Sequence, residues 1–496
     1  MRTPSPDHRD KGLRSRPVQF WAALTIWLFV AAQACAGYSV LTHEEIIDLL
    51  WEQQMKPLLM ARFPDATPDD LAKAHAYAYG GSVIQDVGYY PFGSHQFSDM
   101  THYVRTGDFV KAMLDDSETL DEYAFALGAI SHYVSDINGH PYINLSVGIE
   151  YPKLARRYGP AVPYDLDHKA HLRTEFGFDV LQVAKGRYAP EDYHNFIGFQ
   201  VSKPLLERAF YDTYGIKLTT VMPHEDLAIG TYRRSVSQVL PEMTKVALVA
   251  KGDELQREIP NFNRKAFLYH LSEADYRKSW GSGYKKPGLG ARILAVLFKI
   301  LPKIGSMRAI DFKEPTPQTE DLYFKSVDQT FSHFSSELRA VESQGLSAPN
   351  IDLDTGKPTA PGEYPLADRT YRELLDKLAD DHFEHADEAL RENILQFYDG
   401  LGAPTPDAPI DRCDAGCWRK TLLEVNQLRA VALLDPADRA ALSRSQTITS
   451  TSAAVKAGAK ASALEQGRQE RRTHQIHQKT SSSSVYFRTP SAAALR

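Results

Sequence analysis

Apolar residues recur every three or four positions through most of residues 38–276, a spacing typical of amphipathic helices. The clearest stretches are residues 43–51, 69–79, 120–136 and 168–183. Strict alternation of apolar and polar residues, the signature of half-buried strands, is scarce. Loops rich in Gly, Pro and aromatic residues separate the helical stretches, as in GGSVIQDVGYYPFGSH (80–95). The pattern predicts an all-α fold whose loops can carry functional side chains.

The C-terminal half continues the helical pattern and then loses it. Residues 315–345 and 366–400 predict further amphipathic helices, and the Pro/Gly-rich stretch 347–365 separates them. Within that stretch Asp352, Asp354 and Gly356 lack the full spacing of a calcium loop and predict a turn. We therefore expect a multi-helix domain over residues 37–275 and an accessory helical region over residues 276–440. The Ser/Thr/Ala/Gln-rich residues 441–496 predict a disordered tail.

Composition restricts the kinds of site that are possible. The chain has 496 residues, 43% of them hydrophobic, and a net charge of −6, which describes a globular protein without a global bias toward nucleic acid. Three cysteines are too few for a disulfide-built scaffold or a thiolate zinc cluster. Any metal must therefore bind His and carboxylate side chains. Cys413 and Cys417 have a spacing that allows a local disulfide in an oxidising compartment.

The N-terminus has the features of an export signal. Basic residues precede an apolar run over residues 20–32, and Ala34-Cys35-Ala36 provides an A-x-A cleavage site, so residues 1–36 predict a signal peptide. Export to a periplasm or to the exterior is expected, and no later segment is long and apolar enough to span a bilayer. Cys35 offers lipoprotein acylation as an alternative, although the residues before it fit that signal poorly.

Residues 276–310 differ from the rest because they carry eight Lys or Arg residues and no acidic residue. They contain ARILAVLFKILPKIG (291–305), which predicts a cationic amphipathic helix lying in a lipid interface, with the protein peripheral on the membrane. The alternative is a helix that packs on the core and leaves its lysines in water.

The candidate chemistry centres on ALGAISHYVSDINGHPYIN, residues 126–144. His132 and Asp136 are four positions apart and share one face of a helix. The Asn-Gly before His140 and the Pro after it predict that the helix ends there, which would let His140 turn toward a neighbouring site. Two imidazoles and a carboxylate suit a divalent metal such as zinc. The alternative is a core helix with two hydrogen-bonded histidines.

Histidines and spaced carboxylates also gather around this segment. His171 and Glu175 form an H-x3-E pair on one helical face. Asp86 lies in the Gly/aromatic loop, sixteen residues before His102. His168 is an alternative to His171. Nine of the 17 histidines fall between residues 38 and 200: His43, His75, His95, His102, His132, His140, His168, His171 and His194. His75, His95 and His194 fit surface or core positions better than a site.

The order of these residues resembles the zinc-dependent phospholipase C family, which includes the amino-terminal domain of glycosylphosphatidylinositol phospholipase D. The fungal single-strand-specific nucleases share the family's trinuclear site. The resemblance covers residues 38–200. It depends on five segments: YSVLTH (38–43), GGSVIQDVGYYP (80–91), the MTHY around His102, HYVSDINGH (132–140) and HLRTEFGFDVL (171–181).

The resemblance implies two or three zinc ions. It assigns Asp86, His102, His132 and Asp136 to one site, and His140, His171 and Glu175 to a second. The third would use His43, Asp136 as a bridging carboxylate, and the α-amino nitrogen and carbonyl of the mature first residue. Tyr38 has the family spacing for that residue, whereas the A-x-A signal favours cleavage before Gly37.

The resemblance also implies an activity. The expected function is zinc-dependent hydrolysis of phospholipid head-group esters, with a phospholipid or membrane surface as partner and no nucleic acid. Asp86 is the candidate to orient or deprotonate the attacking water. Two alternatives stay open: a single-strand nuclease that uses the same cluster, and a non-catalytic metal-stabilised binding protein.

Overall fold

The computed structural model describes residues 40–184, 199–234, 313–343, 345–402, 410 and 413–431. All of them belong to the first of two compact units, residues 1–439. The predicted signal peptide, Tyr38, the basic segment 276–310, the domain boundary near residue 275 and the tail from residue 441 lie outside the described residues.

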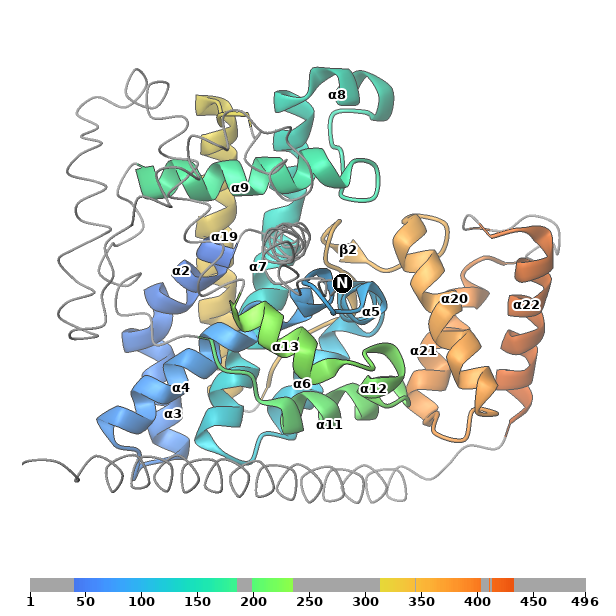
Figure 1. Ribbon diagram of the computed structural model, residues 1–496, viewed down its shortest axis with the longest axis horizontal. Helices are drawn as coiled ribbons and strands as arrows, with labels where there is room; N and C mark the ends of the chain where they lie inside the picture. Colours follow the sequence, from blue (N-terminus) through green and yellow to red (C-terminus); the bar gives the residue numbers. More distant parts are fainter. Residues whose placement is uncertain are drawn as a thin grey trace, which may run out of the picture. The chain divides into compact units, whose positions relative to one another are not determined.

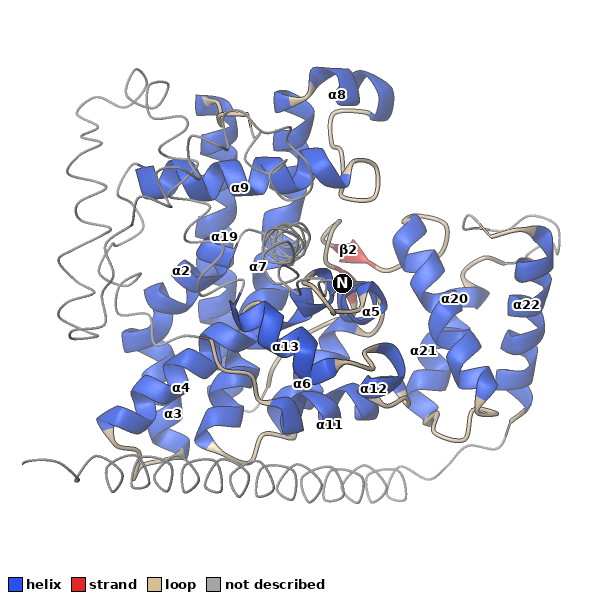
Figure 2. Cartoon of the chain, viewed as in Figure 1, coloured by secondary structure: helices blue, strands red, loops and turns tan. Residues whose placement is uncertain are grey.

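The described part of the chain is mostly helical and has almost no strand (Figure 2), which confirms the all-α prediction. Two short strands, β1 (Ile351–Asp352) and β2 (Lys357–Pro358), pair antiparallel. The first helices are α2 (Val40–Leu50), the π-helix η2 (Trp51–Met55), α3 (Lys56–Arg62), α4 (Pro68–Gly81), the 3-10 helix η3 (Ile84–Tyr89), α5 (His95–Tyr103), α6 (Thr106–Asp115), α7 (Leu120–Glu150), α8 (Pro152–Tyr158) and α9 (His168–Ala184). The later helices are α11 (Lys203–Tyr214), α12 (Leu218–Val221), α13 (Glu225–Arg234), α19 (Pro317–Glu342), α20 (Pro365–Asp380), α21 (Glu388–Asp399) and α22 (Ala415–Ala430).

Helix α7 is the element on which the others pack. Thr119 and Glu122 form a capping box that fixes its start, because each side chain bonds the other residue's backbone N–H. Helices α4 and α19 pack along it, and α2, α6 and α9 also contact it (Figure 1). Gly128 allows the close approach of α4, since a Cβ there would lie 2.1 Å from the Ala78 carbonyl oxygen. This contact brings the end of α4 against the first third of α7.

The prediction that this helix ends at His140 is wrong. Helix α7 continues through Pro141 to Glu150. Proline removes one backbone hydrogen bond, but the later turns pack into a second apolar cluster through Ile143 and Val147. Asn144 adds a 2.8 Å hydrogen bond to the carbonyl of Asp354. Tertiary contacts therefore outweigh the local cost of the proline.

The C-terminal elements pack against the N-terminal helices. Phe334 of α19, Leu353 after β1 and Leu374 of α20 belong to the same apolar core as Phe97 and Phe125. The region predicted as helical over 366–400 forms two helices, α20 and α21, because the residues at 382 and 383 adopt left-handed backbone conformations. Elements on both sides of residue 275 therefore contribute to one core.

Two smaller features complete the fold. None of the helices in the described part of the chain is both long and apolar enough to cross a bilayer. Cys413 and Cys417 do not form the predicted disulfide. Asp414 lies between them as the N-cap of α22 and accepts the backbone N–H of Cys417, so the chain turns and the two cysteines do not share one helical face.

Candidate metal centre

Asp136 lies at the middle of a buried cluster of imidazoles. Its Oδ1 is 3.5 Å from Nε2 of His43 and 3.8 Å from Nε2 of His140. Its Oδ2 is 3.0 Å from Nε2 of His132 and 3.4 Å from Nε2 of His102. The carboxylate therefore faces two imidazoles with each oxygen, which is the arrangement expected of a bridging ligand.

Two further groups flank Asp136. On one side His102 Nε2 lies 3.3 Å from Asp86 Oδ1 and 3.5 Å from His132 Nε2. On the other, Glu175 Oε1 lies 2.9 Å from His171 Nε2 and 3.6 Å from His140 Nε2. The structure thus brings together eight candidate ligands, each at most 2% exposed: His43, Asp86, His102, His132, Asp136, His140, His171 and Glu175.

Hydrogen bonds to backbone carbonyls orient the rings of this cluster. Nδ1 of His132 donates to the Ser82 carbonyl at 2.9 Å, and Nδ1 of His102 donates to the Ser98 carbonyl at 2.7 Å. A carbonyl oxygen only accepts, so the neutral ring carries its proton on Nδ1 and its lone pair on Nε2. Both Nε2 atoms face the carboxylates.

The start of α2 is fixed next to His43. Asp179 of α9 accepts hydrogen bonds from the Leu41 backbone N–H at 3.2 Å and from the Thr42 hydroxyl at 2.9 Å. A carboxylate at a helix N-terminus satisfies free N–H groups and the helix dipole. Helix α9 therefore holds α2 in place while it also supplies His171 and Glu175.

The side chains of the cluster fit a divalent metal. Within the described residues, no oxygen of the Asp86, Asp136 or Glu175 carboxylates accepts a hydrogen bond, and all six atoms are buried. These oxygens face ring nitrogens that also offer lone pairs. Buried acceptors that face one another require positive charge between them. Nitrogen and carboxylate ligands in small groups are the set that zinc binds, so the residues present fit zinc.

A proton can supply that charge at some positions, because the Asp136 and Asp354 carboxylates outweigh burial and raise the pKa of His140 to about 10, but not at every position. Burial and the adjacent His132 hold the pKa of His43 well below its usual range. Burial and the neighbouring His140 lower the pKa of His171 to about 3. These two imidazoles are therefore neutral at ordinary pH. Burial also raises the pKa of Glu175 well above its usual range, which shows how poorly this buried site tolerates a carboxylate without a cation.

The other histidines between residues 38 and 200 that the structure describes do not join the cluster. His168 is exposed and its ring packs edge-on against Tyr164, with ring centroids 4.2 Å apart. His75 contacts Asp48, and His95 is exposed beside Tyr89. His194 and Tyr38 lie outside the described residues.

One group beside the cluster was not predicted from the sequence. The turn expected at residues 352–356 is present between β1 and β2, but the carboxylate of Asp354 is buried and lies 3.0 Å from Nδ1 of His140. Tyr103 and Tyr364 donate hydrogen bonds to it. Asp354 is far along the chain from every histidine of the motif. No sequence spacing could therefore have predicted that it lies beside His140.

Residues 42–222 match the family model described as zinc dependent phospholipase C. This part of the chain belongs to the zinc-dependent phospholipase C family. All eight clustered ligands lie within the matched range, and Asp354 lies beyond it. No curated protein and no solved structure matches the chain. The match confirms the resemblance, and for this part of the chain it supports a metal-dependent hydrolase.

Proposed function

We propose that this protein is a zinc-dependent phosphodiesterase that hydrolyses the head-group esters of phospholipids. The observation that supports it most directly is the Asp136 carboxylate, which faces four imidazoles from within the family-matched range. Apolar residues of similar size would stabilise the core at least as well as a buried carboxylate does. The presence of Asp136 is therefore better explained by metal binding than by stability.

Each group of side chains has its own task in this proposal. Asp86, His102 and His132 would hold one ion, and His140, His171 and Glu175 a second. His43, His132 and Asp136 form a third group that adjoins both. Zinc bound there would acidify a water toward neutral pH and place positive charge next to the phosphate oxygens. The protein's part is to fix these ligands in a buried, preorganised frame.

Asp86 is the candidate to handle the attacking water. It lies on η3 at the edge of the cluster, with one oxygen 3.3 Å from His102 Nε2. Burial raises the pKa of Asp86, which moves this carboxyl toward the range in which a base can accept a proton. One of its oxygens can bind a cation while the other orients the water.

Phospholipid is proposed as the substrate class because two segments of the sequence favour a membrane surface. The N-terminal 36 residues resemble an export signal, which would place the protein in a periplasm or outside the cell. Residues 276–310 are basic throughout and contain an apolar core segment. Each basic residue near an anionic bilayer contributes about 1 kcal/mol of attraction, so this segment would hold the enzyme on its substrate.

The proposal is tested by phosphorus NMR of phosphatidylcholine vesicles incubated with the zinc-loaded protein. C-type cleavage predicts a phosphocholine signal that disappears with a chelator or in His132→Ala. The matched control is His168→Ala, because His168 is an exposed histidine of α9 outside the cluster. That variant should keep wild-type activity. Release of phosphatidic acid would instead indicate D-type cleavage.

A nuclease is the second candidate because aromatic rings lie beside the metal ligands. The Tyr164 ring centroid is 5.6 Å from that of His171, and Tyr89 lies 6.0 Å from His102. Tyr164 is partly exposed and can stack on a base, whereas Tyr89 is buried. An unchanged phosphorus spectrum together with cleavage of single-stranded DNA would replace the lipid proposal. If neither substrate is cleaved but zinc binds, the protein is a metal-stabilised binding protein.

A further inference from the structure

The hairpin of β1 and β2 packs between the helices that carry the metal ligands. Leu353 donates its backbone N–H to the carbonyl of His102 on α5 at 3.0 Å. Asn144 of α7 donates to the carbonyl of Asp354 at 2.8 Å. Gly356 permits this approach, since its left-handed φ of 67° and the nearby Ile137 carbonyl leave no room for a side chain. The hairpin is therefore bonded to both α5 and α7.

The side chain of Asp354 is held on both of its oxygens. Oδ1 lies 3.0 Å from Nδ1 of His140. Oδ2 accepts hydrogen bonds from the hydroxyls of Tyr103 at 2.8 Å and Tyr364 at 2.5 Å. The two phenols leave the carboxylate no freedom to rotate away from the imidazole, and the residue is only 3% exposed.

We propose that Asp354 is a positioning residue that fixes the ring of His140 and strengthens its Nε2 as a zinc ligand. Metal-binding histidines donate their other N–H to a carboxylate or carbonyl, which sets the tautomer and raises the ligand's basicity. His102 and His132 use backbone carbonyls for this purpose. His140 Nδ1 also lies 3.1 Å from the Leu353 carbonyl, but of these three imidazoles it alone faces a carboxylate as well.

This inference deepens the proposed function and rests on it. It assigns a task to the accessory region, because Asp354 and Tyr364 both lie beyond the family-matched residues 42–222. The region would thus complete the metal centre as well as pack against it. The Leu353 carbonyl, 3.1 Å from the same Nδ1, remains after substitution of Asp354. The expected effect is therefore a weakening and not a complete loss.

The test is the zinc dissociation constant of Asp354→Ala and Asp354→Asn in the full chain, measured by competition with a chromophoric chelator. Outer partners of this kind change metal affinity by about 10–100-fold. Asp354→Ala should weaken to that extent the zinc that His140, His171 and Glu175 would hold. Asp354→Asn keeps an acceptor but no charge, so its affinity should fall between alanine and wild type. Tyr364→Phe should lower affinity by less than either.

Asp352→Asn is the matched control. Asp352 is as buried as Asp354 and belongs to the same hairpin, where it accepts the backbone N–H groups of Asp354 and Thr355. Asp352→Asn should lower the stability of the zinc-free protein and leave the zinc affinity unchanged. Thermal unfolding of every variant without zinc separates folding defects from binding defects.

The outcomes distinguish this inference from the proposed function. If wild type binds zinc and Asp354→Ala binds it equally tightly, the positioning role is wrong while the proposed function stands. Equal weakening in Asp352→Asn and Asp354→Asn would also overturn it, because the hairpin would then act only through its fold. If wild type binds no zinc, the proposed function itself fails.

Discussion

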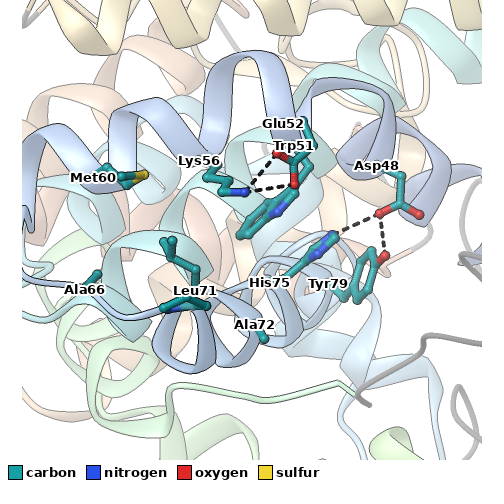
Figure 3. Close-up of a pocket in the computed structure, with 11 residues that line it drawn as sticks. Asp48, Trp51, Glu52, Lys56, Met60, Ala66, Leu71, Ala72, His75 and Tyr79 are labelled. Carbon is teal, nitrogen blue, oxygen red and sulfur yellow. Dashed lines mark hydrogen bonds and ion pairs between the residues drawn. The ribbon is translucent and has the colours of Figure 1, made fainter. Parts of the chain in front are cut away.

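In the described part of the chain, helix α2 contributes to two histidine–aspartate clusters. One surrounds Asp136 and includes His43 of α2. The other lies on the outer side of α2 and α4, where Asp48 contacts His75 and Tyr79 (Figure 3). Asp48 Oδ1 is 2.9 Å from His75 Nε2 and also accepts a hydrogen bond from the Tyr79 hydroxyl. Both clusters contain aspartate and histidine, so residue types alone do not show which of them would bind a metal.

The clusters differ in how donors and acceptors are matched. In the outer cluster a carboxylate faces an N–H and an O–H, and His75 stacks on Trp51 with ring centroids 3.8 Å apart. Its side chains border a cavity of about 600 Å³ and are partly exposed. Around Asp136, carboxylate oxygens face imidazole lone pairs without hydrogen bonds among the described residues. Mismatch of this kind, and not the presence of histidine, indicates a cation site.

Of the substitutions considered, replacing Asp136 should have the largest effect on zinc binding and activity. Asp136→Asn keeps the side-chain shape but removes the charge shared by four imidazoles. We expect loss of bound zinc and a fall in ester hydrolysis of more than about 100-fold, the upper range for residues that only support a ligand. Elemental analysis of the purified protein measures the zinc.

The corresponding change in the outer cluster serves as control. Asp48→Asn should retain the zinc content and activity of wild type. An equal loss of zinc in both variants would mean that the outer cluster also supports metal binding. Full zinc content in Asp136→Asn would contradict the bridging role.

The part of the site that follows local spacing could be predicted from the sequence. His132 and Asp136 share a helical face, as do His171 and Glu175, because four residues span about one turn. His140 was expected beside the cluster for the wrong reason. It lies there because α7 does not end, so the helix carries this third residue onto the face of the other two.

The part of the site that depends on distant segments could not be predicted. Asp354 reaches His140 only because a hairpin after α19 packs between α5 and α7. No periodicity connects residues this far apart, and its sequence predicts only the local turn, which is present. The pairing of Asp48 with His75 is likewise set by the packing of α2 on α4.

Glu150 shows a third way in which a buried carboxyl is accommodated, through a proton. Burial raises its pKa to about 7, although the hydroxyls of Thr174 and Thr319 and the charge of Lys313 act in the opposite direction. Because the folded state then binds the proton more tightly than the unfolded state, stability falls as the pH rises from about 4.5 to about 7. Glu150→Gln removes this dependence.

Denaturant unfolding at pH 5 and pH 8 measures the effect. Wild type should lose about 2–3 kcal/mol more than Glu150→Gln between these two values, since each unit of pKa shift corresponds to about 1.4 kcal/mol. Glu52→Gln is the control, because the Glu52 side chain is 70% exposed. It should lose as much as wild type. Parallel curves for all three proteins would show that Glu150 is ionised in the folded state.

The smallest expected effect comes from Tyr79→Phe, which removes one donor from Asp48 and leaves His75 in place. A hydrogen bond to a charged group contributes about 1.5–3 kcal/mol, and Asp48 is partly exposed, so the free energy of unfolding should fall by about 1.5 kcal/mol, the low end of that range. Zinc affinity should not change, because the outer cluster satisfies its own polar groups. Denaturant unfolding with and without zinc provides both measurements. If the free energy of unfolding falls only in the zinc-loaded protein, α2 couples the two clusters. The conclusion that they are independent would then be wrong.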